Sequence, residues 1–359
     1  MTLKVCLIGC GKIADGHVEE IQKIDGVALG AVCDLELLLA EQLAVRYGIP
    51  AHYDDVARML AAEKPDVVHI TTPPQSHLAL AVQCIDAGCH VYVEKPLTVD
   101  YGQAVELIEH AERSHKKIVV GHSFEFDPAA VALRKLVKQD VLGEIVHIEC
   151  FLGYNLSGPF GSVLLGDGRH WVHHLPGKLF HNNINHVLYK ILEYLPDEKP
   201  TVYAHGYTRR DGRFGDVRDE LQDEMRVIIA GETTTGYATF SSHARPVRHF
   251  AKFFGTKNTV NVDYMLRTVT FDHADHLPSA IGRLLPTFGQ SWDYFTSGGK
   301  NIIRFARSDF QFFAGMKNLF MRFYDSIRND SDPPISYRET LRITAIMDQI
   351  FKQLEEGRR

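Results

Sequence analysis

The chain opens with an apolar strand that runs directly into a glycine-rich turn. Residues 3–14 read Leu-Lys-Val-Cys-Leu-Ile-Gly-Cys-Gly-Lys-Ile-Ala, which places Gly9-x-Gly11-x-x-Ala14 between a buried strand and a helix. Gly9 permits the tight turn, and Gly11 lets the backbone approach a pyrophosphate. The N–H groups at the start of the helix, which begins with Lys12, Ile13 and Ala14, then face the phosphates. The pattern predicts a dinucleotide-binding βαβ unit; the alternative is a ligand-free turn of the same shape.

An acidic residue at the end of the second strand indicates which dinucleotide is bound. The strand Val27–Cys33 is followed by Asp34, 23 residues beyond Gly11. A carboxylate at this point accepts hydrogen bonds from the ribose hydroxyls, whereas a 2′-phosphate would need a nearby Arg or Lys. The sequence therefore favours NAD over NADP.

Predicted strands and helices alternate over the first 122 residues, and the order of elements then changes. Such alternation demands a parallel sheet with right-handed crossovers. From residue 201 to residue 271 strand-like runs follow one another with short turns, which indicates antiparallel pairing. The prediction is an α/β protein with a Rossmann doubly wound parallel sheet in residues 1–122. A C-terminal α/β domain with a large, mainly antiparallel open sheet would fill residues 123–359, its final helix 337–354 packing back toward the first domain.

Composition excludes several classes of protein. The chain of 359 residues is longer than one hydrophobic core usually serves, which agrees with two domains. A net charge of −6 without a Lys/Arg stripe argues against nucleic-acid binding. We expect a cytoplasmic protein, because no signal segment and no apolar run of about 20 residues is present. The six cysteines show no C-x-x-C spacing and are typical of small buried residues in a reducing compartment.

Further segments carry a resemblance to a known family. They are Thr71-Thr72-Pro73-Pro74-Gln75-Ser76-His77, Glu94-Lys95-Pro96, Gly177 to His186, Gly255-Thr256-Lys257 and the Pro-Pro-Ile-Ser before the last helix. Together with Gly9 to Ala14 they resemble the Gfo/Idh/MocA family, named for glucose-fructose oxidoreductase and inositol dehydrogenase. The resemblance covers essentially the whole chain, and Glu-Lys-Pro is its most specific piece.

The resemblance implies hydride transfer between NAD(P) and a sugar, cyclitol or related polyol. Lys95 matches the family lysine that touches cofactor and substrate, and an ammonium there can stabilise an alkoxide as an alcohol becomes a ketone. A surface lysine in a turn is the alternative. Pro96 is expected to follow a cis bond, as in relatives. The implied cofactor-binding residues are Gly9, Gly11, Lys12, Ile13, Ala14, Asp34, Thr71, Thr72, Pro73, His77, Glu94 and Lys95.

A histidine in the second domain is the expected base. His186 aligns with the histidine of the family's Gly-Gly-x-x-x-Asp-x-Gly-x-His segment, and a neutral imidazole can take the hydroxyl proton as hydride leaves. Asn182 stands where relatives often carry Asp, and Ile184 replaces a family glycine. Asn can orient a group but cannot hold a proton, so the expected catalytic residues are Lys95, His186 and, as an orienting group, Asn182. The alternative for His186 is a helix cap.

Substrate contacts are expected from the same region. Phe124 and Glu125 stand where many relatives place Arg, which weakens the case for an anionic substrate there. The nearby polar and aromatic side chains are instead suited to hydrogen-bond the hydroxyls of a sugar and to stack on its ring. The expected substrate-binding residues are Lys95, Trp171, His174, His181, Asn182, Asn185 and His186. No metal is expected, because the histidines form no His-Glu-x-x-His helix and the family chemistry needs none. Residues 272–276 (Asp-His-Ala-Asp-His) are read as a solvated turn.

The stretch from Ile302 to Ile327 mixes many aromatic residues with Arg and Lys. Core packing or a subunit interface is one explanation; a nucleotide-sugar site or an amphipathic membrane contact is another. The open second sheet predicts a homodimer or homotetramer. The leading hypothesis is an NAD-dependent oxidoreductase acting on a sugar, cyclitol or sugar derivative. The alternatives are a nucleotide-sugar or keto-sugar reductase, a redox-assisted epimerase or eliminase in glycan assembly, and a non-catalytic NAD-binding regulator.

Overall fold

The computed structural model describes residues 2–209, 213–214, 217–218, 221–272, 280–306 and 314–357. It divides into two compact units: Met1–Ser123 with Gly315–Ala345, and Phe124–Ala314 with Ile346–Arg359. The first unit thus takes in a segment from near the end of the chain. The turn expected at 272–276, from His273 on, and the aromatic residues of 307–313 lie outside the described residues.

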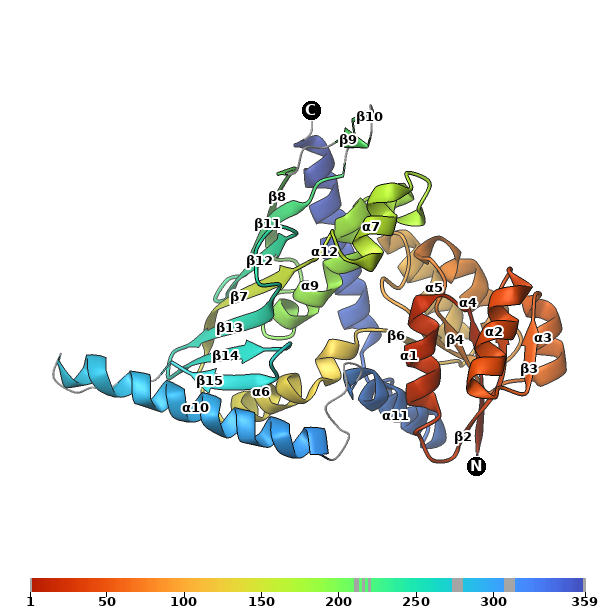
Figure 1. Ribbon diagram of the computed structural model, residues 1–359, viewed down its shortest axis with the longest axis horizontal. Helices are drawn as coiled ribbons and strands as arrows, with labels where there is room; N and C mark the ends of the chain where they lie inside the picture. The colour runs from red at the N-terminus through yellow and green to blue at the C-terminus, as the bar shows by residue number, and fades with distance from the viewer. Residues whose placement is uncertain are drawn as a thin grey trace. The chain divides into compact units, whose positions relative to one another are not determined.

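The first unit is built on six parallel strands in the order β3-β2-β1-β4-β5-β6 (Figure 1). The strands are β1 Leu3–Ile8, β2 Val27–Cys33, β3 Ala51–Tyr53, β4 Val67–Ile70, β5 His90–Val93 and β6 Ile118–Val120. The helices between them are α1 Lys12–Ile21, α2 Leu37–Tyr47, α3 Val56–Glu63, α4 His77–Asp86 and α5 Tyr101–Arg113. The predicted Rossmann sheet is confirmed, and its chain order reverses between β1 and β4, where such sheets bind ligands.

Local sequence signals explain where these helices begin and end. Asp55 starts α3 by accepting a hydrogen bond from the Arg58 N–H at 2.7 Å, and Asp100 starts α5 in the same way. Gly48 ends α2 in the left-handed conformation, with φ 65°. The central strands β1, β4 and β5 are almost wholly buried and apolar, because helices cover both faces of a parallel sheet.

The second unit is built on a seven-stranded sheet in the order β15-β14-β13-β7-β12-β11-β8. Its strands are β7 Ile145–Gly153, β8 Thr201–Tyr207, β11 Glu224–Ala230, β12 Thr235–Ser241, β13 His249–Gly255, β14 Thr259–Asp263 and β15 Thr268–Phe271. The short strands β9 Arg213–Phe214 and β10 Val217–Arg218 pair with each other. All pairs in the large sheet are antiparallel except β7 with β12. The predicted mainly antiparallel sheet is confirmed.

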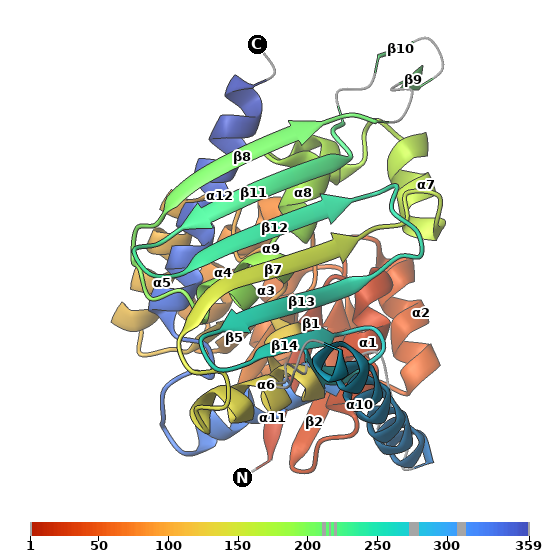
Figure 2. The ribbon, with the colours of Figure 1, turned by 90° about the vertical axis from the view of Figure 1, so that its left-hand side faces the viewer.

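Helices of the second unit lie mostly on one face of this sheet. They are α6 Pro128–Lys138, α7 Pro159–Gly166, α8 Lys178–Asn183, α9 Asn185–Leu192 and α10 Ile281–Ala306, with 3-10 turns η2 Ser123–Phe126 and η3 Trp171–His174. Side chains of β7 alternate, so that Ile148, Cys150 and Leu152 are buried on the face that α9 covers. Among the helices that the structure describes, α10 lies on the opposite face, near β14 and β15, and Figure 2 shows the rest of that face without a helix over it.

Two helices close the chain. Helix α11, Ala314–Arg328, buries Leu319, Phe320 and Phe323 completely. These residues belong to the aromatic stretch noted in the sequence, and in α11 they form core. Helix α12, Tyr337–Glu356, begins in the first unit, where the Tyr337 hydroxyl accepts a hydrogen bond from the Ile118 N–H at 3.1 Å. Among the described residues, no helix combines the length and apolar character needed to cross a membrane.

Candidate active site

The glycine-rich turn has the geometry that a pyrophosphate needs. Gly9 has φ +97°, and a Cβ there would meet Thr72 and Thr71 atoms at 2.8 and 2.9 Å, so only glycine fits this turn. A Cβ on Gly11 would meet nothing within 4 Å. Gly11 is exposed and stands directly before α1, which begins with the exposed Lys12. Open space at a helix N-terminus is a ready site for phosphate, so these residues fit a dinucleotide.

Asp34 is tied to the same turn. Its carboxylate accepts hydrogen bonds from the Cys10 N–H at 2.7 Å and from the Glu36 N–H at 2.9 Å. These contacts fix the carboxylate at the end of β2 beside the glycine-rich turn, and the side chain is half-buried. The oxygens still have acceptor capacity for ribose hydroxyls, because each carboxylate oxygen can accept more than one hydrogen bond.

The segment after β4 packs against the glycine-rich turn and is held there by hydrogen bonds. The Thr71 hydroxyl donates to the Ile8 carbonyl at 3.0 Å and to the Gly9 carbonyl at 2.5 Å. His77 is buried, with Nε2 2.8 Å from the Thr72 carbonyl and Nδ1 3.0 Å from the Pro96 carbonyl. Burial lowers the pKa of His77 although these carbonyls oppose the shift. The imidazole therefore ties two loops together. Thr72 is half-buried and Pro73 exposed on the first of them.

Glu94 and Lys95 stand at the carboxyl end of β5. The Lys95–Pro96 bond is cis. The Lys95 N–H donates to the Glu94 carboxylate at 3.2 Å, and the Lys95 side chain is half-buried. Burial lowers the pKa of Lys95, while the charge of Glu94 opposes the shift. An ammonium at a partly desolvated strand end is suited to stabilise a developing oxyanion, because such charges act more strongly away from bulk water.

A chain of buried polar groups extends from Glu94 through the interior of the first unit. The Glu94 carboxylate lies 3.0 Å from Nε2 of His17, and Nδ1 of His17 lies 3.0 Å from Nδ1 of His69. Nε2 of His69 lies 2.8 Å from the hydroxyl of Tyr324 on α11. Burial disfavours the ionised form of Glu94, but the interactions with His17 and Lys95 together outweigh it and lower the pKa of Glu94. Burial also lowers the pKa of His69, which is therefore neutral.

In the second unit, His186 is half-buried at the start of α9 and is held on several sides. Its Nδ1 lies 3.1 Å from the Tyr189 hydroxyl, and the ring of Phe124 meets it edge to face at a centroid distance of 5.1 Å. When Nδ1 donates its proton to Tyr189, Nε2 is left with the lone pair that a general base needs. Phe124 thus packs against the candidate base.

Lys190 reinforces the position of His186 from one turn further along α9. Its ammonium donates to the His186 carbonyl oxygen and lies 4.4 Å from the ring centres of both Tyr189 and Tyr264. Burial lowers the pKa of Lys190 to about 8, although Cys150, Glu125 and Asp127 favour its charged form. A buried lysine costs stability, so its presence here calls for a role beyond packing.

The remaining predicted substrate residues differ in exposure. Asn182 and Trp171 are half-buried, and His174 is exposed. His181 is buried and stacks on Phe351 at 4.7 Å, and Asn185 is buried as well. The structure therefore offers three of these five side chains, Asn182, Trp171 and His174, with surface that a ligand could reach. Within the described residues, no group of three or more His, Cys, Asp or Glu side chains could hold a metal ion.

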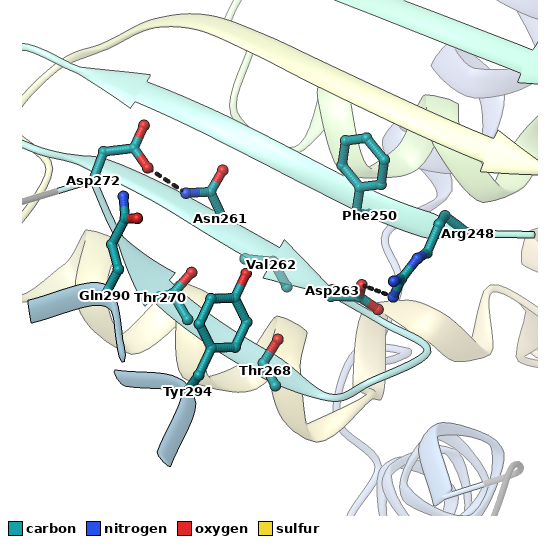
Figure 3. Close-up of a pocket in the computed structure, with 10 residues that line it drawn as sticks. All are labelled: Arg248, Phe250, Asn261, Val262, Asp263, Thr268, Thr270, Asp272, Gln290 and Tyr294. Atoms are coloured by element: carbon teal, nitrogen blue, oxygen red, sulfur yellow. Dashed lines mark hydrogen bonds and ion pairs between the residues drawn. The ribbon is translucent and has the colours of Figure 1, made fainter. Parts of the chain in front are cut away.

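A cavity of about 330 Å³ lies elsewhere in the second unit. Figure 3 shows it between the open face of β13 to β15 and the helix α10. It is lined by Arg248, Phe250, Asn261, Val262, Asp263, Thr268, Thr270, Asp272, Gln290 and Tyr294. Arg248 pairs with Asp263 at 3.3 Å, and Asn261 donates to Asp272 at 2.7 Å. None of the predicted site residues lines it, so this cavity is separate from the candidate active site.

The fold and the glycine-rich turn define a Rossmann protein with an appended sheet. Residues 3–122 match the model of an oxidoreductase family with an NAD-binding Rossmann fold, Gfo/Idh/MocA. The match confirms the expected family and the expected NAD cofactor for this part of the chain.

Individual relatives agree with the match. D-glucoside 3-dehydrogenase of Escherichia coli K12 is 37% identical over 144 residues, 40% of this chain and 41% of that protein. The alignment thus spans less than half of that relative. The WlbA dehydrogenase of Bordetella pertussis, solved with NADH and UDP-GlcNAcA, has a TM-score of 0.77 at 18% identity over 99% of this chain and 96% of that one. The UDP-N-acetylglucosamine 3-dehydrogenase GnnA of Acidithiobacillus ferrooxidans has a TM-score of 0.73 at 19% identity, with both chains covered fully.

The sequence did not point to the buried residues that contact Glu94 and His186, directly or through a neighbour. Lys190 follows His186 by four residues, a spacing that puts both on one face of a helix and could have marked it. His17 and His69 each lie on an element of the first sheet unit, but nothing in the sequence pairs them. Tyr324 contacts His69 from 255 positions further along the sequence, a separation that no local pattern reveals.

Proposed function

We propose that this protein is an NAD-dependent oxidoreductase that moves a hydride between the nicotinamide and a secondary hydroxyl or ketone of a sugar, cyclitol or sugar derivative. The observation that carries this proposal is the partly desolvated Lys95 ammonium, which directly follows β5 at the ligand-binding edge of an NAD-binding sheet. NAD supplies the hydride acceptor when it is bound. All other steps fall to side chains of this chain.

Lys95 and His186 would divide the proton chemistry. In the oxidation, the carbinol C–H bond breaks with its electron pair, and the hydroxyl proton passes to Nε2 of His186. An N–H of Lys95 donates to the substrate oxygen and stabilises its negative charge during the transfer. The Tyr189 hydroxyl lies 3.1 Å from Nδ1 of His186 and would accept its proton in the tautomer that leaves Nε2 unprotonated. Asn182 would orient the hydroxyl without exchanging a proton.

A nucleotide-sugar or keto-sugar substrate, handled by a reductase or by a redox-assisted epimerase or eliminase, is the second candidate. Two structurally similar proteins, one solved with UDP-GlcNAcA and one named a UDP-N-acetylglucosamine 3-dehydrogenase, favour this class. The half-buried Trp171 gives a flat apolar surface of the kind that sugars pack against. We further propose a cytoplasmic location, since all six cysteines are free and buried.

The test is turnover by the purified protein. It is incubated with NAD and a panel of sugars, cyclitols and nucleotide sugars, and NADH absorbance is followed; keto-sugars with NADH test the reverse direction. Lys95→Met is the matched control, because it keeps the length of the side chain and removes the charge. We expect turnover of at least one panel member, lost in Lys95→Met. Tight NAD binding without turnover of any member would instead support the non-catalytic regulator.

A further inference from the structure

Helix α10 has its apolar side turned away from the sheet against which it packs. Its 26 residues form a helix about 39 Å long. Apolar residues recur at spacings of three and four, which puts them on one side of the helix. These residues, here called the α10 stripe, are Ile281, Leu284, Leu285, Phe288, Trp292, Phe295, Ile302 and Ile303, and each is 42–72% exposed.

The polar side of α10 makes the contacts with its own sheet. The Asp293 carboxylate accepts from the Phe271 N–H at 2.9 Å, and the Asn301 amide donates to the Leu266 carbonyl at 2.7 Å. Ser297, on the same side, is 8% exposed. Gln290 and Tyr294 line the cavity over β14 and β15, as Figure 3 shows. A surface helix normally buries its apolar side, so α10 is mounted in the reverse orientation.

The size of the α10 stripe is beyond what a soluble surface usually leaves in water. Phe288, Trp292 and Phe295 are 65–72% exposed, and at 150–250 Å² per aromatic side chain they alone expose roughly 400 Å². Five exposed Leu and Ile residues extend the same stripe. The largest apolar patch on a typical monomer totals only about 300–600 Å² and is often a binding site.

We propose that the α10 stripe inserts into the surface of a lipid bilayer that contains anionic lipids. The charges on α10 favour this occupant. Arg283, Lys300 and Arg304 outnumber Asp293, so the helix carries +2 on a chain whose net charge is −6. Arg283 and Lys300 are exposed, whereas the Asp293 carboxylate already accepts a backbone hydrogen bond. A cationic helix with Trp, Phe and Leu on its apolar side is typical of helices that lie in the membrane interface.

The chemistry of the stripe favours lipid over a second protein copy. It contains no charged or amide side chain that would fix the register of a protein partner, as polar positions do in helix pairs. A fluid acyl phase needs no register. The one polar group in the stripe is the Trp292 indole N–H, which suits the headgroup boundary, where one end of the ring is apolar and the other wet.

Fluorescence of Trp292 tests the proposal. The chain has two tryptophans, so Trp171→Phe leaves Trp292 as the reporter. With phosphatidylcholine vesicles that contain about a third phosphatidylglycerol, we expect a blue shift of its emission and quenching by brominated acyl chains. Binding should weaken with salt and with neutral vesicles, since part of the attraction is electrostatic. Emission that does not change on adding anionic vesicles would overturn the proposal.

A matched pair of variants separates the two possible occupants. Phe288→Gln with Phe295→Gln removes two exposed side chains of the stripe, and Val45→Gln changes an apolar residue of α2 that is 78% exposed. Loss of two phenyl groups that would be buried in the bilayer should weaken vesicle binding at least tenfold, while Val45→Gln leaves it unchanged. Light scattering is measured on the same samples. If the double variant lowers the particle mass and vesicle binding is absent, the stripe binds a second copy and the membrane proposal is wrong.

Discussion

Lys190 is buried in the second unit, and its buried charge lowers the stability of the folded state. A role in holding His186 would explain why a lysine stands there. Burial lowers the pKa of Lys190 from 10.5 to about 8. Below pH 8 the folded state must keep a buried ammonium charged, a cost of about 3 kcal/mol by the size of the shift. Between about pH 8 and 10.5 the unfolded chain binds the proton that the folded chain has lost, so folded stability rises with pH in this window.

Lys190→Met is therefore expected to stabilise the protein and slow it. At pH 7 the variant should gain about 1–2 kcal/mol in free energy of unfolding, because an apolar side chain of similar volume replaces a buried charge. That advantage should shrink between about pH 8 and 10.5, as measured by urea unfolding of both proteins. Turnover should fall about tenfold as the His186 carbonyl loses its ammonium. A variant that is less stable than the wild type at pH 7 would contradict this reading.

His186→Ala and Lys95→Ala separate the two proposed roles. Loss of a positioned base should slow the chemical step roughly a hundredfold or more, with NAD affinity barely changed. Lys95→Ala should weaken both turnover and NAD binding, since that side chain would contact cofactor and substrate together. Single-turnover kinetics and NADH titration give the two readouts. Near-full turnover of His186→Ala would shift the base to the exposed His174, because His181 is buried against Phe351.

Asp34 is expected to set the choice between the two nicotinamide cofactors. Its carboxylate, fixed by the Cys10 and Glu36 N–H groups, can accept from ribose hydroxyls but repels a 2′-phosphate. Wild-type protein should bind NADH more tightly than NADPH, and Asp34→Ala should narrow the difference. Fluorescence titration of both cofactors measures this, and equal or tighter binding of NADPH by the wild type would refute the assignment.

At the scale of elements, the buried polar chain links α11 to the strands of the first unit. His17→Ala should cost about 3–5 kcal/mol, because it leaves the buried Glu94 carboxylate without its histidine partner. It should also weaken NAD binding, since Glu94 accepts from the Lys95 N–H. Tyr324→Phe is the matched control, which removes one hydroxyl for about 1 kcal/mol. Urea unfolding and NADH titration provide the comparison; equal losses in both variants would show that the histidine pair contributes nothing specific.

The helices and strands of the first unit could be predicted from the sequence, because a local sequence signal marks where each one ends. Gly9, Asp34 and Lys95 follow strands of a regular alternation, so sequence was enough to place them. The order of the second sheet was not, because β7 pairs with β12 and β13, which lie about 90 and about 100 residues further along the chain, and packing decides which strands pair. The same holds for α10: the amphipathic pattern predicts an apolar side turned inward, and only the contacts of Asp293 and Asn301 show the reverse.

At the scale of the whole molecule, the open face of the seven-stranded sheet predicts self-association. Tyr203 and Ile228 lie directly opposite each other on this face, 60% and 46% exposed, and Phe250 stacks on Phe151 further along it. Family resemblance implies sheet-to-sheet packing between subunits, and a stable interface of this kind buries about 800 Å² per partner.

We expect a dimer or tetramer by light scattering at micromolar concentration, and smaller particles for Tyr203→Glu with Ile228→Glu, because paired like charges across a symmetric interface repel. The α10 variant Phe288→Gln with Phe295→Gln is the control for this experiment. It changes an equally exposed apolar surface and should leave the particle mass unaltered. A wild-type protein that stays monomeric at micromolar concentration would refute the sheet interface. The apolar residues of the open face would then need a partner other than this chain.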